Sequence, residues 1–182
     1  MKHLINLLLL TAFATASNAQ PGTLDRSFGI NGKVTSENFT ALCYAMAVQP
    51  DGKILMAGEG GYDGAVGYFV ARYNSDGTID NSFGNEGRVI TEFQGSSASV
   101  VEYIAILPSG KILAGGWFGN YGSIDIALVQ YNPNGSLDSS FGINGIVITD
   151  IARFDYIYDM AVQTDGKIIV AGDRVKDENF DT

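Results

Sequence analysis

The sequence predicts an all-β protein: a β-propeller-like array of four-stranded blades, incomplete, with about three repeats of which the last lacks its final strand. Two observations predict this class. One phrase, G-T/S-L/I-D-x-S-F-G, occupies residues 22–29, 77–84 and 135–142, at spacings of 77−22=55 and 135−77=58 residues. Short apolar stretches separated by turn residues lie between its copies. Repeated units of this size must cover each other's apolar faces to be stable.

Each unit is expected to contribute four strands. In the first unit the apolar stretches span residues 33–35, 41–48, 53–57 and 68–73, too short and too rich in Val, Ile, Tyr and Phe for helices. At Asp51-Gly52 the chain favours a tight hairpin with a primed turn. The strand after this turn is almost continuously apolar, which suits a sheet covered on both faces.

Two kinds of residue have an expected packing role between sheets. Ala47, Ala105 and Ala161 recur at one register, where small side chains predict a close approach of neighbouring sheets. The phenylalanine of the repeated phrase, as in Phe83 and Phe141, is expected to plug the gap between one sheet and the next.

Cysteine use excludes an intrachain disulfide, because Cys43 is the only cysteine. Its counterparts in the other units are Val101 and Ile157. We therefore expect the Cys43 thiol to be a buried apolar space-filler and not a nucleophile.

Residues 1–19 have the pattern of a secretory signal peptide, with a basic start, an apolar run and the small-residue site Ser17-Asn18-Ala19. The apolar run, residues 4–14, is shorter than the roughly 20 residues that span a bilayer. We therefore expect a secreted or cell-surface protein without membrane insertion.

The rest of the chain divides into an N-terminal turn-and-plug segment and three repeats. Their expected bounds are 20–31, 32–86, 87–144 and 145–182. The fourth strand of the third repeat should align with Ile126, and 126+56=182 is the last residue. We expect the missing strand to leave an open sheet edge that favours self-association. The alternatives are an open arc that is stable alone and a ring closed by self-association.

Three phrases in a fixed order resemble the delta-60 repeat of secreted and surface bacterial proteins. They read G-T/S-L-D-x-S-F-G-x-x-G, Q-P-D-G-K-I-L-x-A-G and R-Y-N-x-D-G, and the likeness covers residues 21–172. The second unit departs from it at Ser109 and Gln130, and the third at Thr164. The resemblance implies a blade-forming repeat without assigned chemistry, and no catalytic residue is carried over from it. The incomplete third unit separately predicts that this chain is a fragment of a longer repeat protein, because closed propellers usually have at least four blades.

Charge and composition exclude several function classes. Without residues 1–19 the chain has 11−1=10 basic and 20 acidic residues, a net charge of −10, which disfavours nucleic acid as a partner. It also lacks the only histidine, His3, so Ser-His-Asp and Cys-His catalysis and zinc binding have no basis. We expect no catalytic residue, no cofactor and no metal site.

Acidic residues leave two alternatives open. Residues 74–80 offer oxygen ligands at spacings like part of a calcium loop, although Asp and Asn here would equally brace tight turns. Paired carboxylates could also serve a glycosidase, because only their separation in the fold decides. The alternatives to a plain repeat module are therefore a calcium-stabilised binding module and a propeller-type carbohydrate-active enzyme.

The loops after the second long strand of each unit differ between copies, so a binding specificity could lie there. The candidate partner-binding residues are Tyr62, Trp117, Phe118 and Tyr121. The last three would form an aromatic platform, or would fold back onto the neighbouring sheet. The expected function is an interaction or adhesion scaffold for a protein or glycan partner.

Overall fold

The structure is a computed structural model that describes residues 22–35, 40–61 and 66–175. The expected signal peptide and Tyr62 lie outside the described residues. In the described ranges no helix is long and apolar enough to cross a membrane. The regular elements there are ten strands: β1 (Thr40–Val48), β2 (Ile54–Gly61), β3 (Gly67–Tyr73), β4 (Arg88–Glu92), β5 (Ala98–Ile106), β6 (Ile112–Gly119), β7 (Ile124–Tyr131), β8 (Ile146–Thr149), β9 (Phe154–Val162) and β10 (Ile168–Val175).

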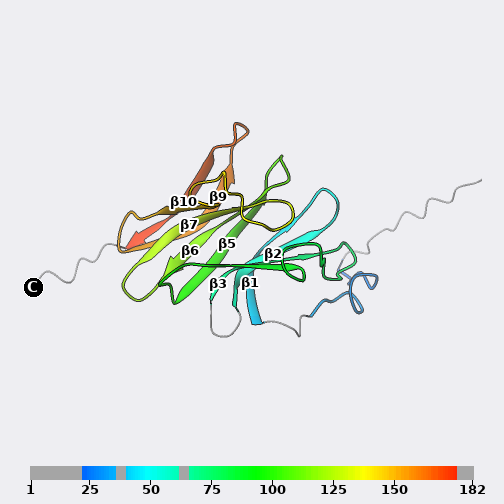
Figure 1. Ribbon diagram of the computed structural model, residues 1–182. Coiled ribbons are helices and arrows are strands. Elements are labelled where there is room, and N and C mark those ends of the chain that lie inside the picture. The colour runs from blue at the N-terminus through cyan, green and yellow to red at the C-terminus, as the bar shows by residue number, and fades with distance from the viewer. Residues whose placement is uncertain (1–21, 36–39, 62–65, 176–182) are drawn as a thin grey trace, which may run out of the picture.

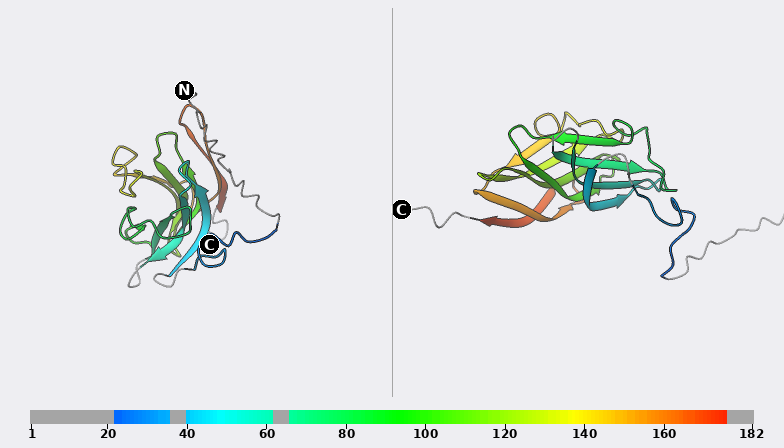
Figure 2. Two further views of the ribbon diagram at one scale, coloured as in Figure 1. Left: turned by 90° about the vertical axis from the view of Figure 1, so that its right-hand side faces the viewer. Right: turned by 90° about the horizontal axis from the view of Figure 1, so that it is seen from below.

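These strands form three blades in chain order, as the colours of Figure 1 show. The first blade is the antiparallel sheet β1-β2-β3-β4, and the second is β5-β6-β7-β8. The third contains β9 and β10, and a single parallel pairing of Ile124 with Phe154 joins it to β7. β1 contacts β5, and β5 contacts β9, so neighbouring blades lie side by side (Figure 2). The described part is thus an all-β, open array of blades, as the sequence predicts.

The fourth strand of each blade comes from residues that follow the repeated phrase. β4 pairs with β3, with Phe69 opposite Ile90, and β8 pairs with β7 in the same way. The prediction that residues 33–35 supply a strand of the first blade is therefore wrong, since Lys33 makes only isolated bridges, to Gly29 and Ile30. The turn after each phrase brings the chain back along the free edge of the preceding sheet, where unpaired backbone groups accept it.

The hairpin between β1 and β2 differs in type from the prediction. Gly52 donates its amide to the Gln49 carbonyl oxygen at 2.9 Å and has a φ of 84°, while Asp51 is not among the non-glycine residues with positive φ. This is a three-residue loop in which glycine occupies the left-handed bulge position, and not a primed two-residue turn. Gly110 and Gly166 have the same geometry in the other blades. The prediction that this turn needs a glycine is therefore correct, but the glycine occupies the bulge position and not a primed turn.

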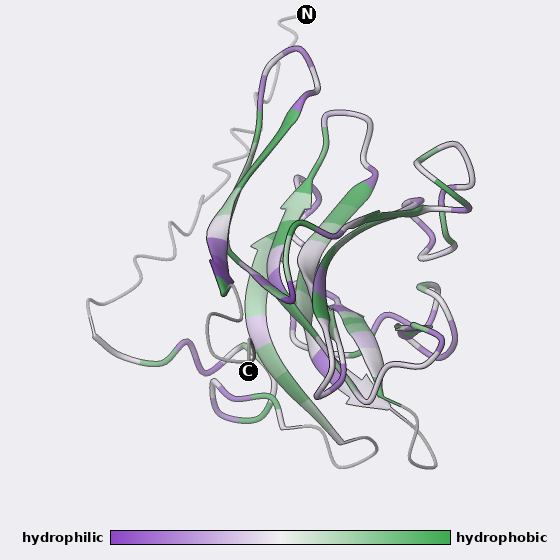
Figure 3. Ribbon diagram, turned by 90° about the vertical axis from the view of Figure 1, so that its left-hand side faces the viewer, coloured by the Kyte–Doolittle hydropathy of each residue, from purple (hydrophilic) through white to green (hydrophobic). Residues whose placement is uncertain are grey.

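The hydrophobic core consists of three clusters, two in the junctions between blades and one on the other face of the first blade. β3 is buried along its whole length because Tyr68 and Val70 face the first junction, while the alternate residues of the strand pack in the cluster on the opposite face. Ala47 packs into the first junction and Ala105 into the second, which confirms the close approach predicted at these positions, whereas Ala161 is exposed. Figure 3 shows the apolar residues along the strands and the polar ones at the turns.

Cys43 is exposed, so the prediction of a buried thiol is wrong. Its counterparts Val101 and Ile157 are both buried. All three residues precede a β-bulge and face a glycine, and at Gly58 a Cβ would collide with the carbonyl oxygen of Leu42. The register is therefore the same. The first blade covers Val101 and the second covers Ile157, whereas no blade in the described ranges covers Cys43.

Candidate functional site

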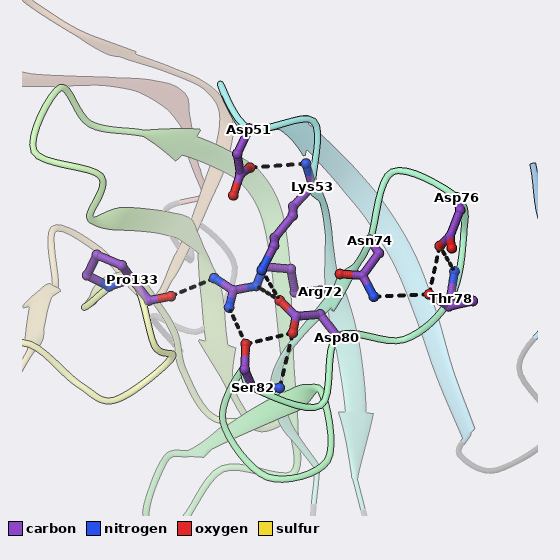
Figure 4. Close-up of polar contacts among 9 residues, drawn as sticks. All are labelled: Asp51, Lys53, Arg72, Asn74, Asp76, Thr78, Asp80, Ser82 and Pro133. Carbon is purple, nitrogen blue, oxygen red and sulfur yellow. Dashed lines mark hydrogen bonds and ion pairs between the residues drawn. The ribbon is translucent and has the colours of Figure 1, made fainter.

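The recurring aspartate of the repeated phrase holds together two strands and a turn. In the first blade Asp80 Oδ2 accepts hydrogen bonds from Lys53 Nζ at 2.8 Å and from Arg72 Nε at 2.7 Å, while Oδ1 accepts from the amide and hydroxyl of Ser82 (Figure 4). We call Lys53, Arg72, Asp80 and Ser82 the Asp80 cluster. The guanidinium of Arg72 also donates to the carbonyl oxygen of Pro133 at 2.6 Å, which extends the cluster to the second blade.

The Asp80 carboxylate is committed to this structural role. Burial opposes its ionisation, but the hydrogen bonds from Lys53, Ser82 and Arg72 outweigh that effect and hold its pKa well below the usual range. Both oxygens already accept from protein donors, so Asp80 is a poor general acid and a poor metal ligand. We assign it to stability.

The aspartates at this position in the other copies also accept hydrogen bonds, and the one within a blade has more donors than the one outside a blade. Asp138 accepts from Lys111 Nζ at 2.6 Å, from Gln130 and from Ser140. Asp25, which precedes the first blade, accepts from Ser27. These ion pairs were not predicted from the sequence. The signal for them was a lysine after each hairpin glycine that recurs together with the aspartate of the next phrase.

The loop at residues 74–80 has the contacts of a braced turn. Asp76 Oδ1 accepts hydrogen bonds from the Thr78 amide at 2.9 Å and from its hydroxyl at 2.7 Å, and these two bonds lower the Asp76 pKa. Asn74 donates to the same hydroxyl. Because Asp80 belongs to its own cluster, both carboxylates of the loop are occupied by protein donors.

The structure does not bring together the three candidate aromatic residues that it describes. Trp117 donates from Nε1 to Glu102 and meets Tyr156 of the third blade edge-on, with ring centroids 5.9 Å apart. Phe118 stacks on Phe93 at 4.4 Å, at the junction with the first blade. Tyr121 lies in the turn after β6 and is 97% exposed. Trp117 and Phe118 thus fold back onto neighbouring sheets, and only Tyr121 stands free in solvent.

One group of carboxylates in the described ranges has the spacing of a metal site. Asp125 lies in β7, Asp150 directly follows β8 and Asp155 lies in β9, and one ligand oxygen from each falls within 4.8 Å of the others. We call these three residues the acidic triad. None of them belongs to a phrase that recurs, so the repeat pattern did not indicate them.

Comparison with known proteins identifies the repeat. No curated protein matches the chain. The family model described as Domain of unknown function (DUF5122) beta-propeller matches residues 49–83 and 107–141. Each match begins at or just before a hairpin turn and ends at the phenylalanine of the repeated phrase, so it includes two strands and the aspartate with its ion pairs. The two matched segments, which cover less than half of the chain, are therefore similar to the beta-propeller repeats that this family model describes.

Proposed function

We propose that the protein is an exported, non-catalytic repeat scaffold that binds a protein or glycan partner at the cell surface. The observation that carries the proposal is that the recurring side chains hold the blades together, whereas other side chains are exposed. Residues that recur between copies are committed to the blades and their junctions, as in the Asp80 cluster. Side chains that no neighbouring blade covers in the described ranges are the ones free to contact a partner.

Several exposed apolar side chains lie together on β1, the edge strand of the first blade. Leu42, Met46 and Val48 are each more than half exposed, and Tyr44 points its hydroxyl to Glu59 at the surface. Apolar side chains along an open edge strand are typical of an interaction surface. We propose β1 as the surface that contacts the partner or a second copy of the chain.

Binding and oligomeric state test this proposal together. The variant Leu42→Ser/Met46→Ser should weaken binding to immobilised surface polysaccharides or proteins at least tenfold, or should convert a self-associated form to monomer in light scattering. Ile143→Ser is the matched control, because Ile143 is exposed as well but lies in the turn before β8. Equal behaviour of the two variants would remove β1 from the proposal.

Catalysis and export have separate tests. If the protein hydrolysed a polysaccharide from a test panel and one carboxylate substitution abolished this activity, the proposal of a non-catalytic scaffold would be replaced by that of an enzyme. For export, we expect the N-terminus of the mature protein to be Gln20 and the protein to leave the cytoplasm only when residues 1–19 are present. A mature protein that begins at Met1 would contradict export by cleavage.

A further inference from the structure

The acidic triad lies where the second and third blades meet. Its residues come from three neighbouring elements: β7, the end of β8 and the start of β9. The single parallel pairing between the blades, Ile124 with Phe154, is directly beside Asp125 and Asp155. Any ligand shared by the triad therefore joins the two blades.

Asp155 gives the triad a second, independent feature. Its side chain is completely buried, and Oδ2 accepts hydrogen bonds from the amides of Ile151 and Ala152 at 2.7 and 3.0 Å. The other oxygen, Oδ1, is buried and has no hydrogen-bond partner in the described structure. A buried carboxylate oxygen without a donor is costly, and a bound cation would satisfy it.

The other two carboxylates increase that cost. Asp125 is half-buried and accepts a hydrogen bond from the Ser123 hydroxyl at 3.2 Å, whereas Asp150 is exposed. Arg153, in the same loop, donates from Nε to the carbonyl oxygen of Gly122 at 3.2 Å. Three carboxylates held this close repel one another unless a positive charge lies between them.

The first junction shows that the repeat alone does not produce the triad. By strand register, Asp125 and Asp150 correspond to Gly67 and Glu92, and a Cβ at Gly67 would collide with the carbonyl oxygen of Thr91. That junction is closed instead by Phe93, which is buried and stacks on Phe118. The residue after Asp150, Ile151, is 57% exposed, so the second junction lacks this aromatic contact.

We propose that the acidic triad binds one Ca²⁺ ion that fastens the third blade to the second. The ligands are carboxylate oxygens only, the donor set that hard divalent cations prefer. The exposed position of Asp150 leaves room for water to complete the six to eight oxygens that Ca²⁺ takes. With three carboxylates and no dedicated cage we expect a Kd on the order of 0.1–1 mM, typical of extracellular calcium modules.

Calorimetry and thermal unfolding of the purified full chain test the site. Relative to the protein in chelator, 5 mM Ca²⁺ should raise the melting temperature by several degrees with one ion bound per chain, and 5 mM Mg²⁺ should do less. Asp125→Asn and Asp150→Asn should each weaken Ca²⁺ binding at least tenfold. In chelator both should melt at or above the wild-type temperature, because each removes a repulsive charge. This last readout separates loss of a ligand from loss of the fold.

The matched control is Glu92→Gln, which removes one acidic charge at the position that corresponds to Asp150 in the first junction. It should leave the Ca²⁺ affinity and the calcium-induced shift unchanged. The proposal is overturned if the wild-type protein shows neither a binding heat nor a melting shift at 5 mM Ca²⁺. It is equally overturned if the two triad variants bind as the wild type does. Neither result depends on the scaffold function or on the β1 surface.

Discussion

Arg72 of the first blade donates from its guanidinium to the backbone carbonyl of Pro133 in the second blade, at 2.6 Å and across 61 residues of sequence. The same side chain reaches Asp80 through Nε, and 6% of it is exposed. Gln130, its counterpart in the second blade, reaches Asp138 but is too short for a second contact of this kind.

Arg72→Gln should therefore keep the bond to the aspartate and lose the bond between blades. We expect a loss of about 1–3 kcal/mol in the free energy of unfolding, since a buried charged hydrogen bond is removed and the Pro133 carbonyl loses its donor. Urea unfolding followed by circular dichroism measures it. Arg26→Gln, at an exposed arginine, is the control and should change little. Equal effects of the two would contradict the role of the Pro133 contact.

Acid should destabilise the protein through its ion-paired aspartates. The pKa of Asp138 is lowered by hydrogen bonds from Lys111, Ser140 and Gln130, and that of Asp80 by those of its cluster. In the unfolded chain both titrate near 3.8, so the stabilisation is complete above about pH 5 and is lost as the pH falls below that value. The unfolding free energy of the wild type should fall steeply between about pH 4 and pH 2.

The variant Asp80→Asn/Asp138→Asn checks this assignment. It should be less stable than the wild type at neutral pH, because Lys53 and Lys111 lose their partners, but its stability should depend less on pH in the acid range. Asp25→Asn, at the same place in the phrase but outside a blade, should reduce the pH dependence less than the double variant does, because only the hydrogen bonds from Ser27 lower the Asp25 pKa. A double variant with an undiminished acid slope would assign the effect to other carboxylates.

Glu86 occupies a backbone position that suits asparagine. Its φ is 49°, and the residues at the same place in the other copies are Asn31 and Asn144, with φ of 54° and 53°. Asparagine tolerates this left-handed conformation better than glutamate. Glu86→Asn should stabilise the protein by about 0.5–1 kcal/mol, less a few tenths for the exposed pair with Arg88. The reverse change, Asn144→Glu, should lower the melting temperature, and a rise there would refute the backbone argument.

Cys43 should react with thiol reagents in the folded protein, because it is exposed. Neighbouring residues still desolvate the thiol and raise its pKa, so labelling should be complete without denaturant but slower than for cysteine in an unstructured peptide. Cys43→Val should change the stability little, although Val101 fills the corresponding place in the second blade. Labelling that requires urea would restore the interpretation of a buried thiol.

The recurring residues were sufficient to predict the blades and the hairpin glycines, because each copy must solve the same packing problem. They also predicted the plugs, since Phe83 is buried in the first junction and Phe141 packs against the second. They could not predict to which blade β4 belongs. In a periodic sequence any residue can be taken as the start of the repeat, so the pattern does not show whether β4 ends one blade or begins the next. The exposure of Cys43 was missed for a related reason. Periodicity fixes the register of a residue, but coverage depends on whether a neighbouring blade is present.

Features that occur only once in the chain could not be predicted from the repeat pattern. Asp125, Asp150 and Asp155 are brought together by strand pairing and by the short connection between β8 and β9, neither of which the sequence reveals. The aromatic residues were a different matter. Trp117 and Phe118 are adjacent in one strand, where side chains alternate between faces, so a shared platform was excluded by strand geometry once β6 was recognised.

The position of β4 beyond the phrase that ends the first unit has a consequence for how such arrays change in length. Any segment one period long holds one complete set of strands, whichever residue it starts from. Unequal recombination between copies therefore adds or removes one whole blade, with hydrogen-bonded partners restored on both sides of the break. Gene duplication needs no privileged cutting point, so blade number can change while each blade keeps its strand pairing.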